Sequence, residues 1–131
     1  MLVVSSDKWR VAMSQDAGAE MGIERLRVGL SDPTGVYISD AVDRDSYLRD
    51  LAEDLRRHQC DPFQVSAVAM SPGFPDVPDG QTITGWCLAR KSGYWLVYQP
   101  DQDRFYCFWG TDSMNLGAHG VYGSPLYCWS A

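Results

Sequence analysis

Residues 82–110, TITGWCLARKSGYWLVYQPDQDRFYCFWG, decide the fold of this chain. Three runs rich in aromatic and β-branched residues, 82–90, 94–99 and 104–110, are separated by KSG and PDQD, which are typical turn sequences. Short turns join strands that are antiparallel neighbours. The stretch therefore predicts a C-terminal meander of three adjacent antiparallel strands.

Both faces of this meander are expected to be apolar. Side chains alternate across a sheet, and both alternating sets within 94–98 and 105–108 contain aromatic or apolar residues. A helix can cover one face. The other face needs cover from N-terminal strands, from the long loops or from a partner, for which exposed aromatic residues would serve as anchors.

A single amphipathic helix is predicted from near Asp43 or Asp45 to His58, because either aspartate suits the first turn of a helix. Apolar residues fall on one stripe at helical spacing; they are Tyr47, Leu48, Leu51, Ala52 and Leu55. Basic residues end the helix, and Pro62 follows. The predicted fold class is therefore α+β, an antiparallel sheet with one principal amphipathic helix packed on it.

Upstream of this helix the pattern favours a β-hairpin. Two glycines in 18–22 indicate a break, and residues 23–30, IERLRVGL, then alternate as a half-buried strand would. SDPTG at 31–35 is turn chemistry, and VYIS at 36–39 is expected to form the second strand. Residues 2–15 fit a strand or a helical turn equally well.

Downstream of the helix, FQVSAVAM at 63–70 predicts one more strand. The following SPGFPDVPDG, 71–80, predicts a long exposed loop because its prolines and glycines prevent regular structure. Residues 111–125 are expected to form a glycine-rich loop, and LYCWSA at 126–131 to add an edge strand or to pack on the sheet.

Length and charge limit the function classes. A chain of 131 residues with 45% hydrophobic residues is expected to form a single domain, 1–131, around one core. Its 17 acidic and 11 basic residues leave a net charge of −6, which repels nucleic acid and attracts a basic protein. Solubility alone is the competing explanation of this charge.

No segment has the pattern of an export signal or of a membrane anchor. MLVVSSDKWR lacks a basic n-region and has only three consecutive apolar residues after the methionine. No later segment approaches the roughly 20 apolar residues of a spanning helix. We therefore expect a cytoplasmic protein that does not bind a membrane.

The cysteines are expected to be buried, reduced thiols. Cys60, Cys87, Cys107 and Cys128 are 27, 20 and 21 residues apart, without a CxxC pair. With two isolated histidines they match no zinc-ligand spacing, so no metal site is predicted. GxGxxG and GxxxxGKS motifs are absent from the sequence, and no cofactor is predicted.

Each histidine has a structural and a chemical interpretation. His58 ends a charged helix, where the helix dipole accounts for it. His119 lies in NLGAHGVYG, 115–123, a glycine-rich setting of the kind in which binding and catalytic residues are found. A pairing of His119 with Cys107 or Cys128 would make the chain a small cysteine-dependent enzyme.

Acidic residues concentrate in the predicted helix and its approach. Residues 32–61 contain eight acids and four arginines, a net charge of −4 that accounts for most of the −6 of the chain. A solvated helix face is the simpler explanation. The functional explanation is an electrostatic docking surface for a basic partner.

The stretch GYWLVYQPDQDRFYCFWG, 93–110, resembles the hairpins of small bacterial toxin-immunity proteins. The resemblance covers about a quarter of the chain, in aromatic strands joined by an Asp-rich turn. It implies an acidic, cytosolic, α+β or β-rich protein that neutralises a toxin by docking on or near its active site. No specific immunity family and no specific toxin is implied.

The predicted function is therefore a stoichiometric protein-binding inhibitor of the immunity type, with a basic toxin domain as partner. The charge-steering residues are predicted to be Asp43, Asp45, Asp50, Glu53 and Asp54. Contacts on loops or strand ends are predicted for Asp101, Asp103, Trp109 and His119. The alternatives are the cysteine–His119 enzyme and a ligand-binding or self-associating scaffold domain, whose aromatic face forms a pocket or a homodimer interface.

Overall fold

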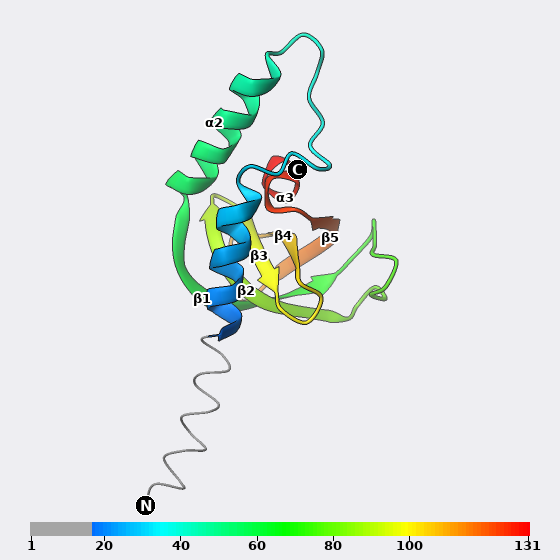
Figure 1. The fold of residues 1–131 in the computed structure, drawn as a ribbon. Helices are drawn as coiled ribbons and strands as arrows, with labels where there is room; N and C mark the ends of the chain where they lie inside the picture. The colour runs from blue at the N-terminus through cyan, green and yellow to red at the C-terminus, as the bar shows by residue number, and fades with distance from the viewer. Residues whose placement is uncertain (1–16) are drawn as a thin grey trace, which may run out of the picture.

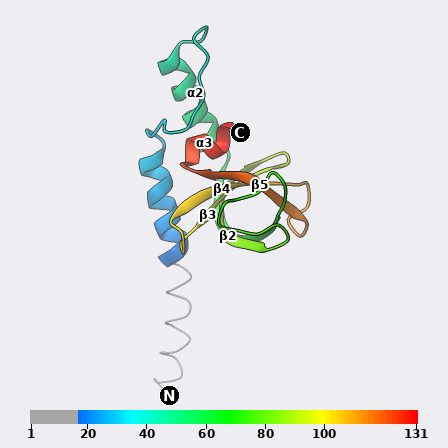
Figure 2. The same ribbon diagram turned by 90° about the vertical axis from the view of Figure 1, so that its right-hand side faces the viewer.

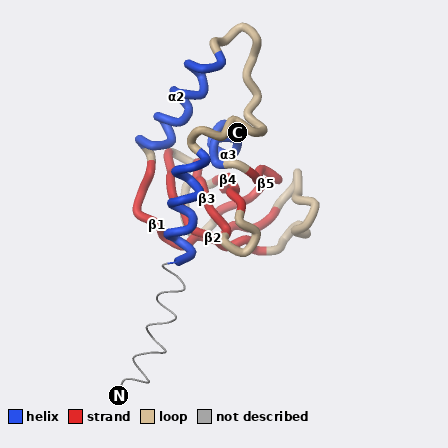
Figure 3. Tube along the Cα trace, viewed as in Figure 1, coloured by secondary structure: helices blue, strands red, loops and turns tan. Residues whose placement is uncertain are grey.

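The computed structural model of the protein describes residues 17–131 as a small β-barrel flanked by helices (Figure 1). The prediction for residues 2–15 lies outside this range. Strands and helices together confirm the α+β class (Figure 3). Among the described residues, no helix has both the length and the apolar character needed to cross a bilayer.

Five strands close the barrel in sequence order. They are β1 (Gln59–Ala69), β2 (Thr82–Lys91), β3 (Tyr94–Gln99), β4 (Arg104–Trp109) and β5 (Leu116–Gly123). Consecutive strands are antiparallel, and the predicted meander is confirmed as β2–β3–β4. The barrel closes where β5 pairs in parallel with β1, Leu116 opposite Ala67.

Closure of the barrel explains why both faces of the meander are apolar. One face lines the barrel interior, where Trp95 pairs with Phe108 and Val97 with Tyr106, all buried. Small residues from β1 and β5, such as Ala67, leave room for these large rings in so narrow a barrel. The face that the sequence left without cover is therefore covered by the other half of the same sheet.

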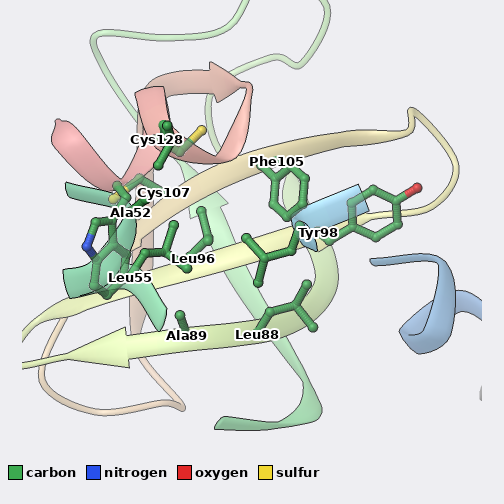
Figure 4. Packing of buried hydrophobic residues seen from close by; sticks show 12 residues of the cluster. Ala52, Leu55, Leu88, Ala89, Leu96, Tyr98, Phe105, Cys107 and Cys128 are labelled. Atoms are coloured by element: carbon green, nitrogen blue, oxygen red, sulfur yellow. The ribbon is translucent and has the colours of Figure 1, made fainter. Parts of the chain in front are cut away.

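The outer face of the meander packs under the helices. Leu96 and Tyr98 of β3 join a buried cluster with Leu26, with Leu55 and with Leu126, each from a different helix (Figure 4). A one-residue irregularity in the β2–β3 pairing between Cys87 and Ala89 separates the interior Cys87 from its neighbours, so that Leu88 and Ala89 both join this outer cluster.

The predicted principal helix is confirmed as α2 (Arg44–Arg57), whose fully buried residues lie in its C-terminal half, while Leu48 of the N-terminal half is partly buried against the same core. Ala52 and Leu55 are its buried residues. The N-terminal half extends beyond the barrel, and a loop returns from its tip to the preceding helix (Figures 1 and 2). The outer face of the sheet is therefore covered by three helices within residues 17–131, of which α2 is one.

The strand prediction for 23–30 is wrong, because residues 17–29 are helical in the described part of the chain. Glycines form the contact face of this helix: a Cβ on Gly22 would lie 2.9 Å from the Tyr98 ring, and one on Gly29 would lie 2.3 Å from Pro125. Together with buried Leu26 they recur at helical spacing. These glycines mark close packing, so the interpretation of the glycines in 18–22 as a break is wrong.

Three further predictions need correction or confirmation. Residues 36–39 form no strand, and a closed barrel offers no free edge with which they would pair. The glycine-rich 116–123 is β5 itself. The C-terminal run is a short helix, α3 (Pro125–Ser130), which packs on the sheet as one of the two alternatives anticipated.

The loop 71–80 is irregular and mostly exposed, as predicted, but it also closes one end of the barrel. Its Phe74 is 9% exposed and belongs to the inner cluster, with ring centroids 5.5 Å from Tyr106 and 5.8 Å from Tyr122. Arg104 fixes the loop by an ion pair with Asp76 at 2.9 Å.

Candidate functional site

One projecting feature of the fold is the acidic arm, which we define as residues 36–50, the approach to α2 and its N-terminal half (Figure 1). Its acidic residues are Asp40, Asp43, Asp45 and Asp50, and its basic residues are Arg44 and Arg49. All six are exposed, and the segment has a net charge of −2. The arm thus presents a surplus of negative charge away from the barrel.

Most of the arm's carboxylates are free to meet a partner. Among residues 17–131, no basic side chain lies within 4 Å of Asp40, Asp45 or Asp50, and no side chain donates a hydrogen bond to any of the three. Asp43, the N-cap residue of α2, accepts a hydrogen bond from Ser46 Oγ at 2.7 Å. The carboxylates of the arm therefore contribute little to holding it in place.

Two apolar side chains of the arm were not predicted as site residues. Tyr37 is 84% exposed and Val42 is 46% exposed, beside Asp40 and Asp43 in the sequence. The sequence pattern assigned Tyr37 to a strand, where it would have been half-buried. Tyr37 and Val42 are thus accessible to a partner, which would bury them on binding.

Glu53 and Asp54, by contrast, make contacts within the protein. Glu53 lies 3.6 Å from Arg57 one helical turn away. Asp54 accepts hydrogen bonds from Lys91 Nζ at 2.7 Å and from Trp129 Nε1 at 2.9 Å. Lys91 and then Trp129 hold the pKa of Asp54 below its ordinary value. The carboxylate of Asp54 therefore ties α2 to β2 and α3.

Trp109 and His119, predicted separately, lie together in an aromatic row of His58, Trp129, Tyr94, Trp109 and His119. Successive ring centroids are 5.9, 6.0, 5.9 and 5.6 Å apart. The row runs from the end of α2 across α3, β3 and β4 to β5. Only Trp129, at 3% exposed, is buried; the other four are partly exposed.

The β3–β4 turn is a separate place, beside the N-terminal helix and away from the arm (Figure 1). Asp101 is exposed there. Asp103 has a positive φ of 50° and accepts hydrogen bonds from Arg25 Nε at 2.9 Å and from the Tyr98 hydroxyl. Arg25 and then Tyr98 lower the pKa of Asp103. Asp103 therefore orders the turn and docks the helix.

The predicted site residues thus divide among four places. Asp43, Asp45 and Asp50 lie on the arm, Trp109 and His119 at one end of the aromatic row, and the two turn aspartates beside the N-terminal helix. Glu53 and Asp54 lie where α2 meets the barrel. The nine predicted site residues therefore do not form one surface. The arm of α2 and the β3–β4 turn lie on different sides of the barrel (Figure 1).

The thiols lack the properties that cysteine catalysis requires. Burial raises the pKa of Cys87 and of Cys107 to about 12 and that of Cys128 well above its ordinary value, and it also raises the pKa of Cys60. All four are free thiols and stay protonated at neutral pH. His119 Nδ1 lies 3.1 Å from the Ser71 carbonyl oxygen. These pKa values weigh against the cysteine–His119 alternative.

Within residues 17–131, no three His, Cys, Asp or Glu side chains are placed to hold a metal ion. Comparison of the chain with protein-family models, with curated proteins and with solved structures found no significant match.

Proposed function

We propose that this protein is a stoichiometric inhibitor of a basic protein, of the immunity type, and that it binds this partner through the acidic arm. One observation carries the proposal: the arm projects from the barrel and exposes Tyr37 and Val42 among carboxylates that have no basic partner among the described residues. A basic toxin domain is the specific partner we propose.

The arm combines two contributions that protein recognition needs. Unpaired carboxylates attract a basic surface over distances of about 8 Å at physiological salt and so raise the association rate. Tyr37 offers a ring and a hydroxyl whose burial stabilises the complex, as tyrosine does at many interface hot spots. The charge of the arm thus raises the association rate, while burial of Tyr37 and Val42 lowers the dissociation rate.

Charge reversal of the arm tests this proposal. The variant Asp40→Lys, Asp45→Lys, Asp50→Lys is compared with Glu20→Lys, Asp61→Lys, Asp112→Lys, which makes the same charge change at exposed positions elsewhere. Wild-type and both variants are immobilised and exposed to lysate and secreted fractions of the source organism, and retained proteins are identified by mass spectrometry. We expect one basic protein to be retained by the wild type and by the control variant and lost from the arm variant.

The kinetics of that complex give the second readout. We expect the arm variant to associate at least about tenfold more slowly, with a weaker dependence on salt, because steering by these carboxylates is lost. Retention of the partner by the arm variant at the wild-type association rate would exclude the arm as the binding surface. Equal loss of binding in both variants would show that the partner responds to the net charge of the protein and not to the arm.

A further inference from the structure

One end of the barrel contains a cavity that the acidic arm does not explain. It has a volume of about 310 Å³ and lies between the β2–β3 turn and the end of β4. Its polar lining consists of Arg90, Lys91, Ser92 and Thr111, with Trp95 at its wall and two glycines completing it. No acidic side chain lines it, although the protein as a whole has a net charge of −6.

Arg90 is held in place by aromatic rings. Its guanidinium carbon lies 5.3 Å from the ring centroid of Phe63 and 5.4 Å from that of Trp95, within the range of cation–π contacts. The two rings themselves meet edge to face at 6.1 Å. Trp95 is fixed in turn, because its Nε1 donates a hydrogen bond to the Gly110 carbonyl oxygen at 2.8 Å. Arg90 therefore loses little conformational freedom on binding a ligand.

Arg90 forms no ion pair within the part of the chain that the structure describes. No carboxylate of the described residues lies within 4 Å of its guanidinium, whereas Lys91 Nζ is paired with Asp54 at 2.7 Å. Rings bind the flat faces of a guanidinium and leave its N–H groups unused, and these N–H groups match the oxygens of a carboxylate or phosphate. The pocket thus supplies one uncompensated cation, hydroxyl groups and an indole wall.

We propose that this pocket binds the oxyanion group of a small ligand, a phosphate or a carboxylate, with Arg90 as the principal donor. Ser92 and Thr111 offer further hydroxyl donors, and Trp95 provides an apolar wall for the rest of the ligand. The volume is at the lower end of that of small-molecule pockets, roughly 300–1,000 Å³, so a compact ligand fits. This site is independent of the acidic arm and of its proposed partner.

Nuclear magnetic resonance titration of the full chain tests the proposal. Sodium phosphate is added to ¹⁵N-labelled protein at constant ionic strength, maintained with sodium chloride, and sodium acetate is added in a parallel series. We expect saturable shifts of the Trp95 indole N–H and of the amides of Ser92 and Thr111 in at least one series. A response to phosphate alone assigns a tetrahedral oxyanion, and a response to acetate shows that a carboxylate suffices.

Variants of Arg90 distinguish specific binding in this pocket from non-specific attraction of anions to positive charge. Arg90→Gln should weaken the saturable response at least about tenfold, whereas Arg56→Gln, the same charge change on an exposed face of α2, should leave it unchanged. Arg90→Lys keeps the positive charge but lacks the planar, paired N–H donors of the guanidinium, so it should bind the anion more weakly than the wild type. It replaces Arg90→Gln in the comparison if that variant does not fold. Equal responses of wild type, Arg90→Lys and Arg90→Gln, or no saturable response to either anion, would overturn the proposal.

Discussion

At the scale of single residues, Asp54 shows how a predicted binding residue can be structural. The sequence places it among the acids of an amphipathic helix, where a docking role is a reasonable interpretation. In the structure its side chain is 32% exposed and joins Lys91 of β2 with Trp129 of α3. Trp129 is only 3% exposed, so its indole N–H has little access to water if Asp54 is removed.

Substitution of Asp54 should therefore reduce stability in proportion to the hydrogen bonds lost. We expect Asp54→Ala to lower the free energy of unfolding by about 2 kcal/mol, and Asp54→Asn by about 1 kcal/mol because the amide oxygen still accepts a hydrogen bond. Urea unfolding at pH 7 measures both. The control Asp50→Ala, on the exposed face of the same helix, should change the stability by less than about 0.5 kcal/mol.

The contribution of the Asp54 charge should depend on pH in one direction. Its pKa is lower in the folded protein than the ordinary value of 3.8, so the stabilisation is fully present above that value and is lost as pH falls through the lower, folded-state pKa. The difference between wild type and Asp54→Asn should therefore shrink below pH 3.8. A difference that stays constant from pH 7 to pH 2 would show that the charge plays no part.

At the scale of elements, glycine acts in two different ways within β2 and its turn. Gly85 lies in β2, where an added Cβ would meet the Tyr98 carbonyl oxygen at 2.6 Å and Val97 Cγ1 at 2.7 Å. Gly93, in the β2–β3 turn, has a positive φ of 75° and open space around it. The first glycine permits close approach of two strands, and the second permits a backbone conformation.

These two positions give a matched pair of alanine variants. We expect Gly85→Ala to lower the free energy of unfolding by about 3 kcal/mol, since backbone atoms must move to admit the methyl group. Gly93→Ala should cost only about 1 kcal/mol, the penalty of a left-handed conformation. Thermal or urea unfolding of both variants measures the difference. Equal losses would indicate that β2 and β3 separate more easily than their contacts suggest.

At the scale of the whole molecule, the loop 71–80 is part of the core although it has no regular structure. Phe74 inserts against Tyr106 and Tyr122 at one end of the barrel, and His119 meets the Ser71 carbonyl oxygen at the base of the same loop. An added Cβ at Gly120 would lie 2.8 Å from the Gly73 carbonyl oxygen, so glycine lets the loop approach β5. The loop and β5 therefore depend on each other.

Removal of the Phe74 ring should open this end of the barrel. Phe74→Ala is expected to lower the free energy of unfolding by about 3 kcal/mol, through lost burial and the cavity that remains. It should also expose the amides of 71–80 to hydrogen exchange. Tyr37→Ala, at an aromatic residue that is 84% exposed, should change stability by less than about 0.5 kcal/mol. A cost below about 1 kcal/mol for Phe74→Ala would show that the loop only covers the barrel.

The sequence by itself determined the features whose cause is local. Apolar periodicity in 46–58 predicted α2, and short apolar, β-branched or aromatic runs bounded by turn residues predicted β1 and the β2–β3–β4 meander, because these patterns are local to a single helix or strand. The predicted burial of the cysteines is confirmed for Cys87, Cys107 and Cys128, whereas Cys60 is only partly buried. Of the candidate site, the sequence located the acid-rich α2 and its exposed Asp45 and Asp50.

Only the tertiary structure decided the features whose cause lies in a distant residue. Within the sequence, glycine indicates a break in secondary structure. Gly22 instead packs against Tyr98, in a helix of residues 17–29 that lies on the outer face of the sheet. The parallel pairing of β1 with β5 closed the barrel and buried the face for which N-terminal strands, long loops or a partner were the expected cover. In the same way, contacts with β2 and α3 made Asp54 structural, while exposure made Tyr37 a candidate for binding, since burial is a property of the assembled fold.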